Sequence, residues 1–210
     1  MITLESARQY YPTEDAVHGF DHIERVYAMA QRIGNAEGAD MEILLTAALL
    51  HDMEGSHPDA NRAEHHLDSA AEAERVLRAE GWAQERIDAM THCVRAHRYR
   101  DDREPPETLE AKVLFDSDKL DVLGAVGVAR TIAYAAQAGQ PAYYPPSAQF
   151  LKQGLREADE PHSAYHEYLF KLSKVKDRLY TLTARQIAMD REAYIRDYFN
   201  RLISESKGEC

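Results

Sequence analysis

Histidine and aspartate stand side by side where the most apolar stretch of the chain ends. The sequence from Ile43 to Glu54 reads ILLTAALLHDME, so His51 and Asp52 follow directly on a run of apolar and small residues. No Gly or Pro and no alternation with polar residues interrupts the run, which predicts a helix buried on most sides. A carboxylate there is costly unless a cation or strong hydrogen bonds compensate its charge. The adjacent imidazole favours a metal ion, and a hydrogen-bonded helix end is the alternative.

Further histidines and aspartates extend this chemistry to other parts of the chain. The sequence contains 10 histidines, most of them in its first half, a bias that is typical of histidine-rich metal sites but does not establish one. His22 lies on the apolar face of a predicted helix, one turn before Val26. Asp116, Asp118 and Asp121 follow one another within an apolar segment. Their mutual repulsion is relieved either by a cation or by exposure to solvent.

Helical periodicity predicts the elements that carry these residues, and no strand is indicated. Breaker clusters of Gly and Pro separate the segments. The predicted helices cover residues 14–33, 41–53, 61–80, 84–97, 109–134, 163–178 and 183–204. The expected fold class is all-α, with a single helical bundle over residues 1–210. Its metal-binding core is expected at about 14–135, with C-terminal helices at about 145–206 packing on that core.

Composition limits the partners of the chain. At 210 residues and 44% hydrophobic content the chain is long enough for one sizeable domain with a real core. A formal net charge of -11 argues against an extended nucleic acid, whose binding requires a basic patch. No apolar stretch is long enough to span a membrane, and no secretory signal is recognisable. Cys93 and Cys210 do not make a disulfide framework, so we expect a cytoplasmic protein. The oligomeric state stays open.

The order of the candidate ligands resembles a known family. His22, the His51-Asp52 pair and Asp118 occur as H…HD…D, as in the HD-domain superfamily of metal-dependent phosphohydrolases. The segments HGFDHIERV, AALLHDME, HLDSAAEAERVL and KVLFDSDKLDVLGAVGVAR are similar to those of bacterial HD hydrolases, and the C-terminal helices are similar too. The resemblance implies a helical bundle in which these four side chains bind a divalent metal (Mn, Fe, Co, Ni, Zn or Mg). Asp118 matches the family pattern because a basic residue and Leu follow it, which leaves Asp116 and Asp121 beside the site or at the surface.

The resemblance also raises the alternative of a second metal. In HD proteins with two metals, further histidines follow the HD pair, and His65 and His97 stand in similar places. A surface role is the alternative for both, and the sequence does not decide whether His65 or His66 faces inward. We expect His18 to be a hydrogen-bond partner rather than a ligand. The remaining histidines are expected at the surface or in packing: His57, His92, His162 and His166.

The implied chemistry is hydrolysis of a phosphoric ester of a small phosphorylated metabolite, a nucleotide in particular, by a metal-activated water. Asp52, Glu54 and Lys119 are the catalytic candidates. Glu54 would orient or deprotonate the water, or alternatively cap the helix or pair with an Arg. The basic side chains that could hold phosphate oxygens are Lys119, Arg98, Arg100 and Arg130. The alternatives are an HD-fold sensor that binds a nucleotide or partner without turnover, and a di-iron oxygenase on the same scaffold.

Overall fold

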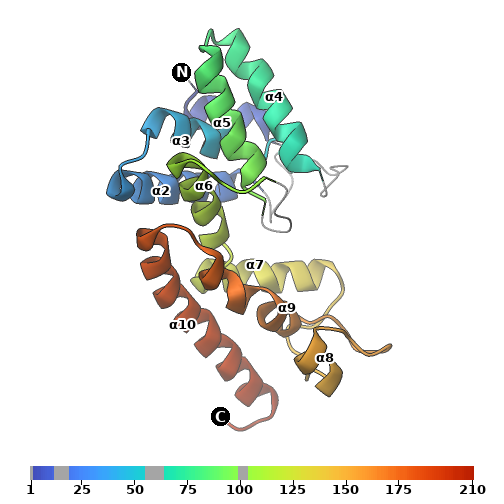
Figure 1. The fold of residues 1–210 in the computed structure, drawn as a ribbon. Helices are drawn as coiled ribbons and strands as arrows, with labels where there is room; N and C mark the ends of the chain where they lie inside the picture. The colour runs from blue at the N-terminus through green and yellow to red at the C-terminus, as the bar shows by residue number, and fades with distance from the viewer. Residues whose placement is uncertain (1, 12–18, 55–63, 99–103) are drawn as a thin grey trace. The chain divides into compact units, whose positions relative to one another are not determined.

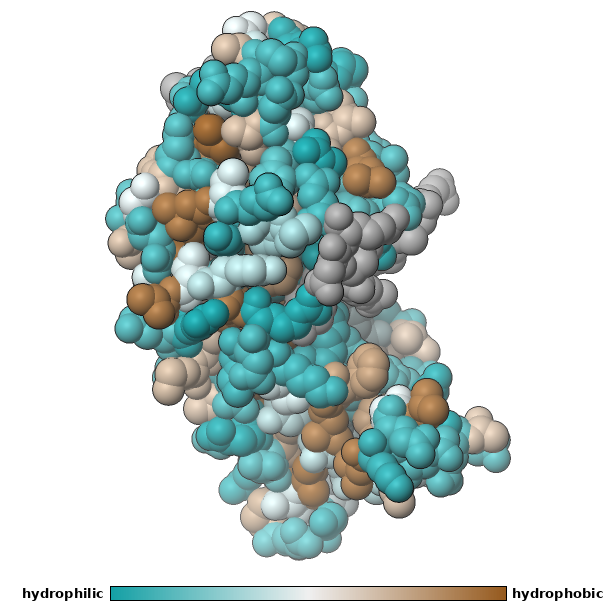
Figure 2. All heavy atoms as spheres, viewed as in Figure 1, coloured by the Kyte–Doolittle hydropathy of each residue, from teal (hydrophilic) through white to brown (hydrophobic). Residues whose placement is uncertain are grey.

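The protein is built from helices. The computed structural model describes residues 2–11, 19–54, 64–98 and 104–210. Every regular element in these ranges is an α-helix or a 3-10 helix, which confirms the all-α class. No helix of the described residues combines the length and apolar character needed to cross a membrane, and the face of the molecule in Figure 2 is largely hydrophilic. The elements are α1 Leu4–Ala7, η1 Arg8–Tyr10, α2 Phe20–Glu37, α3 Met41–Leu50, α4 His65–Ala79, α5 Gln84–Ala96, α6 Leu109–Leu120, α7 Gly124–Gln137, α8 Ala148–Gln153, α9 Ala164–Phe170, η2 Leu172–Arg178 and α10 Leu182–Ser206.

The chain forms two compact units. The first comprises Met1–Lys119 and Leu179–Ala184, and the second comprises Leu120–Arg178 and Arg185–Cys210. All the metal-ligand candidates, from His22 to Asp118, belong to the first unit. The expectation of a single domain over the whole chain stays a prediction.

Helix α3 is the centre of the first unit. The Asp40 side chain caps its N-terminus by accepting the backbone N–H groups of Glu42 and Ile43. Three of its leucines, Leu44, Leu49 and Leu50, are almost completely buried, which stabilises the fold by about 1.5–3 kcal/mol per side chain. Helices α2 and α5 pack against α3, and α4 runs beside α5 (Figure 1). The two helices packed on α3 therefore carry His22, on α2, and end at His97, the C-cap of α5.

Helix α2 extends further than the sequence predicted. It continues through Gly34 to Glu37 instead of ending at Ile33. A Cβ atom at Gly34 would collide with the side chains of Leu44 and Met41, so this glycine permits the close packing of α2 on α3. Gly34 therefore allows close packing within the helix and does not end it. The helix ends instead at Gly38, which has a φ of 81°.

Two other predicted helices are divided in the structure. The segment 109–134 forms α6 and α7, and Gly124, with a φ of 71°, begins α7. The segment 163–178 forms α9, which is followed by the 3-10 helix η2. The aspartates of the first segment therefore do not share one helix, because Asp121 lies beyond the end of α6.

The second unit is held by aromatic packing and by one buried carboxylate. The rings of Tyr168 on α9 and Phe199 on α10 stack with centroids 4.8 Å apart. Glu160 accepts hydrogen bonds from the backbone and hydroxyl of Ser147, from the backbone of Glu157 and from the His166 ring. These bonds tie the connection between α8 and α9 to both of its ends.

Candidate metal centre

Three side chains from three helices converge inside the first unit. His22 comes from α2, His51 directly follows α3, and Asp118 comes from α6. One nitrogen or oxygen atom from each lies within 4.8 Å of the others, and His22 Nε2 is 3.4 Å from Asp118 Oδ1. Both histidines are almost fully buried. Two imidazoles and a carboxylate at this separation could hold a divalent cation.

A second group lies beside the first. It consists of Asp52, His65 and His97, whose ligand atoms also lie within 4.8 Å of one another. Asp52 Oδ1 is 3.6 Å from His65 Nε2. The two groups adjoin, because the ring of His97 lies edge-on to that of His51 with centroids 5.1 Å apart. The structure thus places His65, rather than His66, in this group, and it groups Asp52 with the later histidines instead of with His22.

Two of the histidines are held by the helices that they terminate. His51 is the C-cap of α3, and its Nδ1 lies 2.9 Å from the carbonyl oxygen of Ala48. His97 is the C-cap of α5, and its Nδ1 lies 2.5 Å from the carbonyl oxygen of Val94. A carbonyl oxygen can only accept, so each Nδ1 carries the proton and each Nε2 presents a lone pair. His51 Nε2 is buried without a hydrogen-bond partner among the described residues, as expected of an atom that faces a cation.

The protonation states in the cluster also suit a cation. Burial lowers the pKa of His51 below its ordinary value, against the attraction of Asp118. Burial, followed by repulsion from His51, lowers the pKa of His97 well below its ordinary range. Burial raises the pKa of Asp118, but the attraction of Lys119 and His22 lowers it by more. The pKa of Asp118 therefore lies well below its ordinary value. At neutral pH His51 and His97 are therefore neutral and Asp118 is charged, which are the forms that bind metal.

Comparison with known proteins identifies the family. The sequence model described as "HD domain" matches residues 19–123, the segment that contains both groups. The chain belongs to the HD domain family. It is 32% identical over 199 residues to the YpgQ protein of Bacillus subtilis (strain 168). The aligned region covers 93% of this chain and 87% of YpgQ.

Solved structures of HD proteins have the same fold. The crystal structure of Bacillus subtilis YpgQ in complex with ADP matches with a TM-score of 0.75 and 31% identity, covering 99% of this chain and 100% of that one. An HD-superfamily hydrolase from Bacillus thuringiensis matches with a TM-score of 0.73 and 26% identity, covering 97% of this chain and 94% of that one. One relative of this HD domain protein is thus described as an HD-superfamily hydrolase, and another, YpgQ, has been crystallised with ADP.

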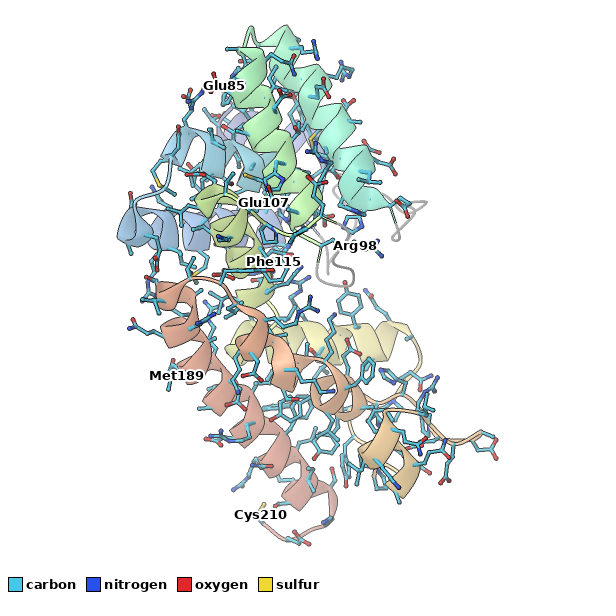
Figure 3. All side chains as sticks on the ribbon, in the orientation of Figure 1. Glu85, Arg98, Glu107, Phe115, Met189 and Cys210 are labelled. Atoms are coloured by element: carbon cyan, nitrogen blue, oxygen red, sulfur yellow. The ribbon has the colours of Figure 1, made fainter. Side chains whose placement is uncertain are left out.

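The candidates for phosphate binding are less closely grouped. Lys119 forms an ion pair with the ligand candidate Asp118, and its ammonium group lies 5.4 Å from the ring centre of Phe115, labelled in Figure 3. Arg98 is half-buried just beyond α5 (Figure 3). Arg130 belongs to the second unit, where it pairs with Asp121. Their substrate-binding roles stay predictions.

Glu54 is placed by its backbone rather than by any contact with the ligand groups. Its backbone N–H donates to the hydroxyl of Ser69 on α4, with a nitrogen-to-oxygen distance of 3.1 Å. Neither of the two groups includes the Glu54 carboxylate, and its catalytic role stays a prediction. Three residues considered in the sequence lie outside the described ranges: His18, His57 and Arg100.

Asp116 and Asp121 are buried, so the surface alternative considered for them is wrong. Asp116 accepts hydrogen bonds from the backbone N–H groups of Tyr180 and Thr181 and from the Thr181 hydroxyl. It therefore anchors α6, the helix that carries Asp118, to the segment before α10. Helical spacing alone could show that Asp116 and Asp118 face different directions, but the partner of Asp116 lies more than sixty residues away in the sequence.

Proposed function

We propose that this HD domain protein is a divalent-metal-dependent phosphohydrolase that acts on a nucleotide. The observation that carries the proposal is the buried convergence of His22, His51 and Asp118 in an HD domain, with the second group directly beside it. The complex of the relative YpgQ with ADP supports a nucleotide as the substrate class.

The residues divide into those that hold the cation and those that face the substrate. His22, His51 and Asp118 would hold one ion, and Asp52, which belongs to the second group, follows His51 directly in the chain. When bound there, the ion lowers the pKa of a water molecule and polarises a phosphoryl oxygen. Lys119 neutralises part of the charge of Asp118 and keeps it ionised.

The remaining candidates would act on the substrate side of the cation. Glu54, which follows the HD pair, would orient the attacking water. Arg98 would contribute positive charge for phosphate oxygens, together with Lys119. The acidic net charge of the chain does not oppose this, because the cation and nearby bases determine the local field.

The second group, Asp52, His65 and His97, raises one alternative function, a di-iron oxygenase, which can be tested together with the hydrolase proposal. The His97 ring lies next to the rings of both His51 and His65, so the site could hold two cations. Two adjacent irons are what a di-iron oxygenase requires. Counting metals per chain and measuring phosphate release in the same samples separates an oxygenase from a hydrolase.

The test is a hydrolysis assay on protein of defined metal content. Purified protein is stripped with chelator, reloaded with Mn, Mg, Co, Ni, Fe or Zn singly, and incubated with nucleoside mono-, di- and triphosphates. We expect phosphate or pyrophosphate release that chelator abolishes and that His51→Ala loses. His162→Ala is the matched control, because His162 is partly exposed and pairs with Glu167 in the second unit.

The negative outcome is equally informative. Binding of ADP without turnover under every metal would contradict the hydrolase proposal and indicate a nucleotide sensor. Turnover that resists chelator, or that survives in His51→Ala, would contradict the role of the cation.

A further inference from the structure

A short N-terminal segment lies against the elements that carry the ligands. Helices α1 and η1 precede the residues 19–123 that match the HD domain, so this segment is an addition to the family core. The side chain of Thr3 caps α1, and the segment ends at Tyr11, which is only 5% exposed. No pattern in the sequence singled out Tyr11. A buried phenol usually has a hydrogen-bond partner, and its partner here is informative.

The Tyr11 hydroxyl lies at the turn that contains the HD pair and bonds to the end of α3. It donates to the carbonyl oxygen of Leu49 at 2.7 Å. Leu49 is among the last four residues of α3, whose carbonyls lack partners within the helix. Burial and then the charge of the Asp52 carboxylate raise the pKa of this hydroxyl well above its ordinary value, so Asp52 lies near it as well. One side chain thus lies next to residues on either side of His51.

The ring of Tyr11 contacts a second ligand-bearing helix. It packs on the ring of Phe20 with centroids 5.4 Å apart. Phe20 begins α2, two residues before His22. Arg8 strengthens this contact, since its guanidinium lies 4.4 Å from the centre of the Phe20 ring and pairs with Glu24 at 2.7 Å. Tyr11 therefore joins the start of α2 to the end of α3.

We propose that Tyr11 is a positioning residue that sets the geometry of the metal ligands from outside the HD core. This inference rests on the proposed function only in that the ligands must bind a cation. His51 is oriented from inside α3 by the Ala48 carbonyl, and the next carbonyl, that of Leu49, is held by Tyr11. Removal of the hydroxyl frees the turn on the side of Asp52, so that the ligands bind the cation in a looser arrangement.

The test compares Tyr11→Phe with wild-type protein in metal binding, with no substrate present. The substitution keeps the ring on Phe20 and removes only the hydroxyl. We expect the affinity for Co²⁺, measured by calorimetry, to fall by roughly 10-fold or more. We also expect the visible absorption spectrum of the Co²⁺ complex to change, since it reports the ligand arrangement. Thr131→Val is the matched control, because Thr131 donates a buried hydroxyl to a main-chain carbonyl at 2.7 Å in the second unit.

Each outcome decides the proposal. A Tyr11→Phe protein with wild-type Co²⁺ affinity and spectrum overturns it, as does an equal loss of affinity in Thr131→Val. If Tyr11→Phe does not fold, Phe20→Leu, which leaves the hydroxyl in place and loosens the ring contact, must show the weaker affinity. Wild-type protein that binds Co²⁺ but hydrolyses no nucleotide refutes the proposed function alone. Wild-type protein that binds no Co²⁺ overturns the positioning role of Tyr11, and protein that binds none of the six cations overturns the proposed function as well.

Discussion

Replacement of Asp116 by Asn should destabilise the protein strongly without touching a ligand. The Asp116 carboxylate is fully buried and accepts hydrogen bonds of 2.9 Å from Tyr180 N, 2.7 Å from Thr181 N and 2.7 Å from Thr181 Oγ1. An amide offers one accepting oxygen and turns an NH₂ group toward the remaining donors. Each bond to a charged group contributes about 1.5–3 kcal/mol, so losing one or two predicts about 1.5–6 kcal/mol of destabilisation. For a chain of this size the melting temperature should fall by roughly 3–24 °C.

The measurement is thermal unfolding of the metal-free protein, followed by far-UV circular dichroism. Asp197→Asn is the control, because the Asp197 side chain is 72% exposed and its loss should change stability by less than about 0.5 kcal/mol. A melting temperature for Asp116→Asn within about 2 °C of the wild type would refute the reasoning. It would mean that the three hydrogen bonds do not hold α6 to residues 179–184.

Three further predictions concern metal content, pH and the second unit. His65→Ala should lower the number of divalent ions per chain counted by mass spectrometry, whereas His162→Ala should not; equal counts would exclude a second ion at His65. The metal-free protein should lose stability as pH falls below about 6.5, because His51 and His97 bind protons in the unfolded chain that they exclude in the folded one. His97→Gln should make stability depend less steeply on pH, and an unchanged slope of stability against pH would contradict this prediction. Burial raises the pKa of Glu160, but hydrogen bonds from its neighbours lower that pKa to about 2. The charged side chain therefore stabilises the folded protein above about pH 4.5, and this stabilisation is lost as the pH falls toward 2. Glu160→Gln should therefore speed hydrogen exchange at the backbone amides bonded to it at neutral pH, and unchanged exchange would show that the charge is not needed.

Local sequence patterns were sufficient for the class of the fold and for the place of the HD pair. The apolar run before His51 predicted a buried helix, and α3 begins and ends close to the expected residues. The helix start at Asp40 follows from a side chain that caps its own neighbours. Such features depend on residues within one or two turns of each other, which is the range over which periodicity and capping are informative.

Interruptions of helices were less predictable, because a glycine has more than one use. The predicted helix over 14–33 ends just before Gly34, but in the structure Gly34 is a position where α3 packs closely on α2. Gly124, by contrast, adopts a positive φ and begins α7 after a break. Both residues lack a Cβ atom, and only the neighbours in space show which property is used.

The sequence by itself determined the helical class, the HD order and the set of side chains able to bind a cation, because residue type and helical spacing are local properties. The tertiary structure decided how those side chains are sorted: Asp118 with His22 and His51, and Asp52 with His65 and His97. It also placed Tyr11 against the turn of the HD pair. These arrangements depend on distances between helices far apart in the chain, and those distances are set by the packing of the core around α3.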